Sequence, residues 1–456
     1  MIIPLINPFD YLILPVYLFL FYRIAKYFQQ AYYKEDPETA RLFLLGFWVK
    51  IFSAVLFTMV TEYYFKNGDT YLYYEEGSKL FKWTLQNTSN ASYIFSPASD
   101  FDNLKTLYGD PDNPGFTASE GNFMPIRFIA LFSFLCFNKY IILAVIFSLF
   151  SFTGLWKIYR SFVYFYPGLK KSLALAFLFL PSVLFWGSSV LKDPICIGCL
   201  GWILSSFVNI LYKKRSWLQN GIIILFAGFI IYLTKAYILV AFVIGLILWL
   251  AGVLKQKIPS PTIRRLVFPV LLTVTALGII LLLDTVQEAL GQYALDNFAE
   301  NVKFNQLNYA ASETAGGGSY FEIGDIDPSL NGMLKVAPKV INATFFRPYL
   351  WESKNIMMLF SALESLVLLS FAVYTLIKLR FFRFWWIIFS EPMVLLSFTF
   401  SIVFGFAVGI TTPNFGTLMR YKIPCIPFFV AMLIIAKYIG TLPKTIPAHS
   451  AGSKGG

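Results

Sequence analysis

The sequence predicts an all-α membrane protein, a polytopic bundle of about eleven transmembrane helices. Hydrophobic residues make up 57% of the chain and charged residues 14%, too little charge for the surface of a water-soluble protein. Apolar stretches of about 20 residues recur along the chain, and each can cross a hydrocarbon layer of about 30 Å. These stretches are continuous rather than alternating, which favours helices over a barrel.

The expected spans are residues 10–28, 42–64, 140–158, 172–187, 194–211, 220–233, 237–253, 266–283, 356–377, 392–410 and 424–438. Alternate connections collect the lysines and arginines, which places those connections in the cytoplasm. We therefore expect the N-terminus outside and the C-terminus in the cytoplasm. The apolar segment 122–138 would put the basic residues of 157–171 outside if it were a span, so we expect it to be interfacial or re-entrant.

The organisation predicted is one membrane domain, residues 1–440, followed by a disordered tail, 441–456. Two long outer loops, 65–121 and 284–354, carry most of the acidic residues, so chemistry is expected on the outer side. The net charge of +12 lies mostly in cytoplasmic turns, which indicates membrane topology and not a nucleic-acid partner.

Histidine and zinc chemistry are disfavoured. The single histidine, His449, lies in the polar tail. Cys196 and Cys199 form a CxxC inside an apolar stretch with no second pair, so packing is the better interpretation. The sequence predicts no metal-ligand set, and no cofactor follows from it, although its acids are compatible with a divalent metal.

Several charged residues are expected at similar depth near the outer ends of spans. They are Asp69, Lys192, Asp193, Lys235, Arg347, Glu352 and Arg420. Charges at that depth are costly unless they are paired or hydrated, so their clustering is a hypothesis of function. The alternative is ordinary snorkelling at span ends.

Structural interpretations stay open for individual residues. Asp69 is also suited to cap an interfacial helix that starts at Thr70. Asp193 is suited to pair with Lys192 or to cap the helix that Pro194 begins. Glu352, next to a tryptophan, fits an interfacial belt.

A carboxylate on the outer side, basic residues around it and apolar walls together suit sugar transfer from a polyprenyl phosphate. The carboxylate takes a proton from the acceptor hydroxyl, and lysine or arginine stabilises the departing phosphate. Arginine binds phosphate through its planar fork, whereas lysine acts as a point charge.

Four short motifs carry a resemblance to a known family: "NGDTYLYYEEG", "LPSVLFWGSSVLKDP", "YLTKAYILV" and "RYKIPCIPFF". Together they resemble the GT-C superfamily of integral-membrane glycosyltransferases and the related bacterial polysaccharide polymerases and ligases. The resemblance implies that Asp69 is the first-loop catalytic acid and Asp193 the second outer acid. It also implies that Lys235 and Arg420 lie near the donor phosphate.

Lys192, Arg347 and Glu352 are assigned to substrate binding from charge and position alone. The chain departs from the family by an extra span before the acid-bearing loop and by the lack of a large soluble C-terminal domain. The implied partners are a polyprenyl-phosphate-linked sugar donor, a glycan or lipid acceptor, and membrane lipid. The implied location is a bacterial inner (plasma) membrane, with the active site on the outer side.

Other functions remain open at this point. A polysaccharide polymerase or ligase of the O-antigen type would share the pocket and use a polyprenyl-diphosphate glycan. A lipid or solute transporter would place charges near the bilayer midplane, where Lys50 and Glu364 are the candidates. A structural subunit of a secretion or motility machine is a third alternative.

Overall fold

The computed structural model describes residues 4–98, 119–257, 270, 273, 298–312, 319–323 and 330–442. These residues are helical apart from short connections and an isolated antiparallel bridge between Tyr320 and Asn414. Within the described part, seven helices are long and apolar enough to cross a membrane, or eight if one bent pair counts as a single span. A polytopic helical membrane fold is thereby confirmed, whereas the count of about eleven and the orientation stay predictions.

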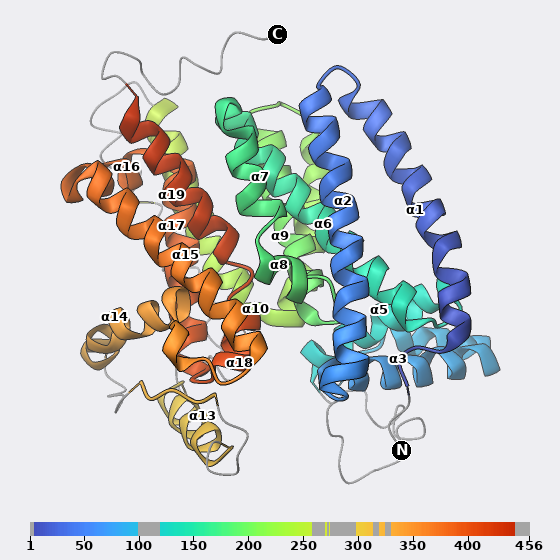
Figure 1. Ribbon diagram of the computed structural model, residues 1–456. Helices are drawn as coiled ribbons and strands as arrows, with labels where there is room; N and C mark the ends of the chain where they lie inside the picture. Colours follow the sequence, from blue (N-terminus) through green and yellow to red (C-terminus); the bar gives the residue numbers. More distant parts are fainter. Residues whose placement is uncertain are drawn as a thin grey trace. The chain divides into compact units, whose positions relative to one another are not determined.

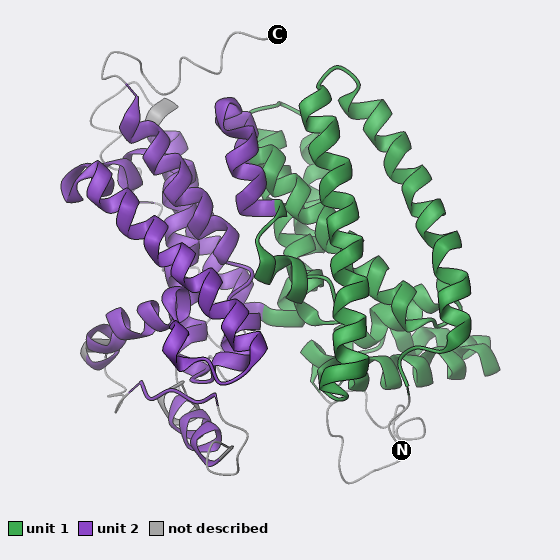
Figure 2. Ribbon diagram, in the orientation of Figure 1, with its two compact units in different colours: residues 1–161, 178–235 green, residues 162–177, 236–456 purple. Residues whose placement is uncertain are grey.

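The chain divides into two compact units, residues 1–161 with 178–235 and residues 162–177 with 236–456 (Figure 2). The helices of the first unit are α1 (Pro8–Tyr33), α2 (Pro37–Val60), η1 (Thr61–Phe65), α3 (Asp69–Gln86), η2 (Thr88–Ile94), α5 (Glu120–Cys136), most of α6 (Tyr140–Phe165), α8 (Pro181–Trp186), α9 (Lys192–Leu211) and the first part of α10 (Trp217–Lys257). The second unit holds the rest of α10, η4 (Pro167–Leu169), α7 (Lys170–Leu178), α13 (Phe298–Ser312), α14 (Leu330–Phe346), η7 (Leu350–Glu352), α15 (Ile356–Leu379), α16 (Phe381–Ser390), α17 (Pro392–Thr411), α18 (Phe415–Tyr421) and α19 (Ile426–Thr441) (Figure 1).

In the first unit, α1 and α2 are antiparallel neighbours joined by a short turn. Asp36 caps α2 by accepting a hydrogen bond from the Thr39 amide at 3.1 Å, and Pro37 occupies the first turn, where its missing N–H costs nothing. At the far end the Leu5 amide donates to Glu62 Oε2 at 2.9 Å. Only 11% of the most apolar stretch of α1 is buried, as expected of a helix that faces lipid.

Two further helices, α3 and α5, lie across the ends of α1 and α2 (Figure 1). The helix α3 begins after Gly68, whose φ of 120° is readily adopted only by glycine. It packs closely on α5, since a Cβ on Gly77 would lie 2.6 Å from the Cβ of Ile129. Neither helix is among the candidate spans, and an interfacial or re-entrant position for the segment 122–138 stays a prediction.

One expected span has a different local structure from the one predicted, and two others meet at a break between them. Residues 172–187 form two short helices, α7 and α8, because Pro181 disfavours helical backbone at the residue before it. Residues 220–233 and 237–253 belong to one element, α10, which is interrupted at Lys235, where φ is −152° and ψ is 76°. The span 266–283 lies outside the described residues except for 270 and 273, and the tail beyond 442 lies outside them entirely.

The core of the first unit depends on a close crossing of α6 and α9. Gly154 on α6 meets Gly198 and Gly201 on α9, and a Cβ on Gly201 would fall on the Gly154 backbone. Small residues at such crossings let helix backbones approach each other in membranes, where dispersion replaces the hydrophobic effect.

We expect Gly201→Ala to destabilise the purified protein by about 1–3 kcal/mol, because the added methyl group has no space at this crossing. Gly228→Ala is the matched control, since a Cβ at Gly228 would meet nothing within 4 Å. Thermal melting in detergent measures both. Equal melting of the two variants would contradict the packing argument.

The core of the second unit is aromatic. Phe242, Phe400 and Phe428 pack edge to face, with ring centroids 5.0–6.0 Å apart. The helices α18 and α19 form the bent pair and meet at 66°. Lys422 lies at this bend and is 2% exposed.

Candidate functional site

A buried ion pair joins two of the residues that the sequence singled out. Asp193, in the first turn of α9, is fully buried, and Lys235 is 7% exposed. The Lys235 Nζ lies 2.5 Å from Asp193 Oδ1. The interruption of α10 falls at Lys235 itself, so the residue that leaves the helical conformation is the one that binds the acid. The N-terminus of α9 adds a favourable field for the carboxylate.

The structure tests one local interpretation of Asp193, that of a helix cap. The N-cap of α9 is Leu191, and it makes no side-chain capping bond. Asp193 therefore does not cap its own helix, and its carboxylate accepts from a lysine 42 residues away.

Lys192 lies beside this pair, next to the start of α5. A Cβ on Gly121 would be 3.2 Å from Lys192 Nζ and 2.8 Å from the Thr234 carbonyl oxygen. The first turn of α5 thus borders both Lys192 and the residue before Lys235. Lys192 is partly exposed, whereas its neighbour Asp193 is buried.

Asp69 is the first residue of α3 and is partly exposed. The N-cap of α3 is Gly68, so Asp69 is not the cap that its sequence context allowed. One turn later, buried Tyr73 donates to Asn122 Oδ1 at 3.2 Å. Asn122 follows Gly121, so the second turn of α3, the first turn of α9 and the interruption of α10 all adjoin the start of α5.

The two glutamates of the same segment have a simpler role. Glu75 and Glu76 both pair with Lys79, at 3.2 Å and 2.9 Å. Burial raises the pKa of the Glu76 carboxyl above its ordinary value, and the hydrogen bond from Lys79 opposes that shift. These acids therefore stabilise α3 through contacts within one helix turn.

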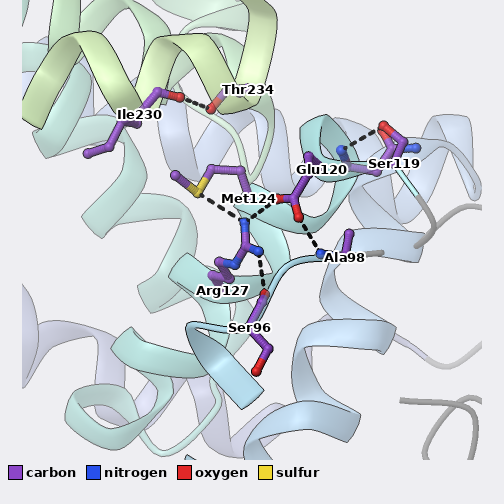
Figure 3. Close-up of polar contacts among 9 residues, drawn as sticks. Ser96, Ala98, Ser119, Glu120, Met124, Arg127, Ile230 and Thr234 are labelled. Carbon is purple, nitrogen blue, oxygen red and sulfur yellow. Dashed lines mark hydrogen bonds and ion pairs between the residues drawn. The ribbon is translucent and has the colours of Figure 1, made fainter. Parts of the chain in front are cut away.

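A second network fixes the segment that precedes α5 to that helix (Figure 3). Arg127, 8% exposed, donates to Glu120 Oε2 at 2.8 Å and to the Ser96 carbonyl at 2.6 Å. Glu120 in turn accepts a hydrogen bond from the Ala98 amide. Arg127 also lies over the Phe123 ring, 4.5 Å from its centroid. Arg127, together with Glu120, therefore holds residues 96–98 against α5.

We expect Arg127→Gln to raise amide hydrogen exchange at Ala98 by about tenfold or more, because Glu120 loses the cation that orients it and the 96–98 segment loosens. Hydrogen–deuterium exchange with mass spectrometry measures the change. Arg23→Gln removes an exposed cation elsewhere in the unit and serves as control. Unchanged protection at Ala98 would show that the network is not what fixes the segment.

Lys50 is a buried cation that sequence reasoning did not include in the predicted site. Lys50, in the middle of α2, is 1% exposed and donates to the Gly187 carbonyl at 2.6 Å and to the Val183 carbonyl at 3.2 Å. Both carbonyls belong to the C-terminal end of α8, where a cation satisfies the last acceptors and the helix dipole. Lys50 thereby anchors the segment that leads to Lys192. The available signal was a lone lysine within an apolar span.

The second unit holds the remaining predicted site residues. Arg347 Nε donates to both carboxylate oxygens of Glu352, at 3.0 Å and 3.1 Å, and a further nitrogen of the guanidinium also binds Glu352. The guanidinium carbon lies 5.0 Å from the ring centroids of Phe321 and Phe415. Arg347 and Glu352 are thus brought together as a bidentate pair within an aromatic box.

Arg420 lies in the last turn of α18 and is partly exposed. Its guanidinium carbon is 5.6 Å from the centroid of the Tyr421 ring. Buried Lys422, two residues later, donates to the Arg347 carbonyl at 3.3 Å. The bend between α18 and α19 is therefore tied to the Arg347–Glu352 pair through Lys422.

Within the described residues, no group of three or more His, Cys, Asp or Glu side chains is arranged to hold a metal ion. In comparisons with protein-family models, curated proteins and solved structures, none matches this chain. The functional argument therefore depends on the residues and contacts above.

Proposed function

We propose that the protein is a membrane-embedded glycosyltransferase that moves a sugar from a polyprenyl-phosphate-linked donor to an acceptor at the outer membrane face. The observation that supports it most is the buried Asp193–Lys235 pair beside Lys192, at the start of α5, which Tyr73 of α3 also contacts. Burying such a pair is expensive, and its position at an interrupted helix suits a binding site better than a packing role.

Each residue of this cluster has a chemical role in the proposal. Asp69, partly exposed, takes the proton of the acceptor hydroxyl. The acceptor oxygen bonds to the anomeric carbon of the sugar while the bond from that carbon to the phosphate oxygen breaks. The bonding electrons leave with the lipid phosphate, and Lys192 stabilises the anion. Asp193 orients Lys235 at the same site.

The second unit enters the proposal with a narrower role. The Arg347 fork is closed on Glu352, so this pair is better suited to shape the segment before α15 than to grip a phosphate. Arg420 keeps its assignment as a donor-binding residue. A bacterial inner membrane and an outer-side active site belong to this proposal as well.

A transfer assay tests the proposal. Purified protein in nanodiscs receives a polyprenyl phosphate carrying a radiolabelled sugar, and extraction with organic solvent separates donor from product. Transfer to an added glycan or lipid acceptor supports the proposal. Turnover only with a polyprenyl-diphosphate glycan, with shortened polymer in a deletion strain, would assign a polymerase or ligase instead.

A transporter is the second candidate, and two observations favour it. The fold contains an interrupted helix at Lys235 and a bent pair at Lys422, and transporters commonly build their binding sites from discontinuous helices. Lys50 is also a buried cation within a span. Counterflow of a labelled lipid-linked sugar in proteoliposomes, without any acceptor, would support this candidate and count against transfer chemistry.

A further inference from the structure

In the first unit α1 and α2 diverge below the turn that joins them (Figure 1). A groove is lined by residues of both helices and of that turn. Its volume is about 710 Å³, within the range of ordinary ligand sites. The groove is remote in the chain from Asp69, Asp193 and Lys235, none of which lines it. It therefore calls for an explanation of its own.

The groove has one basic end and one apolar end. Lys34 and Arg41 are the charged residues that line it, and both lie near the α1–α2 turn. Leu44, Leu45 and Trp48 line the part farther along α2. Asp36, which lies in the turn, is engaged in capping α2. The lining thus offers positive charge at one end and hydrocarbon contact at the other.

The walls of the groove are held by contacts on both sides. Tyr33 accepts a hydrogen bond from Trp156 Nε1 at 2.7 Å, and its ring packs edge to face on Trp156. At the apolar end Tyr22 stacks on Trp48, with ring centroids 5.7 Å apart. The two ends of the groove are therefore fixed by aromatic contacts before any ligand arrives.

The length of the groove matches one leaflet of a bilayer. Lys34 and Tyr22 mark its extent along α1, and twelve residues at 1.5 Å each correspond to roughly 18 Å. Half of a 30 Å hydrocarbon core plus a headgroup is of similar length. The exposed, apolar surface of α1 is in keeping with lipid around the groove.

We propose that this groove binds one anionic phospholipid, with its phosphate against Lys34 and Arg41 and an acyl chain along Leu44, Leu45 and Trp48. Charge complementarity selects the anionic headgroup, because both lining charges are positive. Arg41 suits the phosphate as a fork donor and Lys34 as a point charge. The site is independent of the proposed transfer reaction.

Photo-crosslinking in a mixed bilayer tests this site. The full chain is reconstituted in nanodiscs of phosphatidylglycerol and phosphatidylcholine that contain a trace of phosphatidylglycerol with a diazirine in its acyl chain. After illumination, peptide mapping is expected to place the label on residues of 22–48. The double variant Lys34→Gln/Arg41→Gln is expected to reduce that label roughly tenfold or more, because both basic residues that attract the anionic headgroup are removed.

Two controls make the result decisive. Arg23→Gln/Lys214→Gln removes two exposed cations outside the groove and should leave the label unchanged. Arg41→Lys keeps the charge and should retain most of it, which separates lost binding from lost folding. Equal labelling by a phosphatidylcholine probe, or full labelling of the Lys34→Gln/Arg41→Gln variant, would overturn the proposal.

Discussion

Asp193→Asn is expected to destabilise the first unit by about 3–5 kcal/mol, because it leaves the Lys235 ammonium buried without its carboxylate. Asp193 is fully buried and Lys235 is 7% exposed, so water cannot readily replace the lost charge. The change in melting temperature, measured by thermal unfolding in detergent, reports the effect. Lys235→Met should cost a similar amount, since it removes the ammonium that pairs with the buried carboxylate.

The double variant Asp193→Leu/Lys235→Met separates the contribution to folding from the contribution to function. Replacing both partners of a buried pair by apolar side chains is often neutral or stabilising, so the melting temperature should recover. Transfer activity should not recover if the pair belongs to the site. A double variant that regains both stability and activity would reduce the pair to a structural contact.

Asp69→Asn is expected to lower the transfer rate by about 10²–10⁴-fold, because the amide cannot accept the proton of the acceptor hydroxyl. The melting temperature should stay near that of the natural chain, since Asp69 is partly exposed and the N-cap is Gly68. The assay is release of labelled sugar from polyprenyl phosphate under single-turnover conditions.

Glu75→Gln is the matched control for Asp69→Asn. Glu75 lies on the same helix, is partly exposed and pairs with Lys79. It should therefore leave the transfer rate almost unchanged. Normal turnover by Asp69→Asn, with Glu75→Gln equally active, would remove Asp69 from the mechanism.

The sequence predicted the long spans well where apolar composition and helix continuity coincide. The expected spans 10–28, 42–64 and 140–158 correspond to α1, α2 with η1, and α6. Hydropathy measures partition into lipid and does not report where the backbone leaves the helix. The division of 172–187 into α7 and α8 was consequently not foreseen, whereas the break in α10 lies at Lys235, between the two expected segments.

The sequence indicated which charged residues belong to the candidate site better than it indicated which of them form ion pairs. Charge and depth selected Asp193 and Lys235, but nothing in the sequence shows that residues 42 positions apart meet at 2.5 Å. Arg347 is the opposite case. Its charge and position assigned it to substrate binding, whereas in the structure it binds Glu352, only five residues away. The segment "FFRPYLWES" holds one arginine and one glutamate and has no net charge, which would have favoured a local pair between them.

The same sequence separation has a consequence for biosynthesis. Ribosomes add roughly 5–20 residues per second, so the 42 residues between Asp193 and Lys235 correspond to about 2–8 s of translation. During this interval the nascent α9 carries an acid at its bilayer end whose ammonium partner has not yet been synthesised. The ion pair can therefore form only after the first half of α10 has been synthesised, and α9 folds at first without that contact.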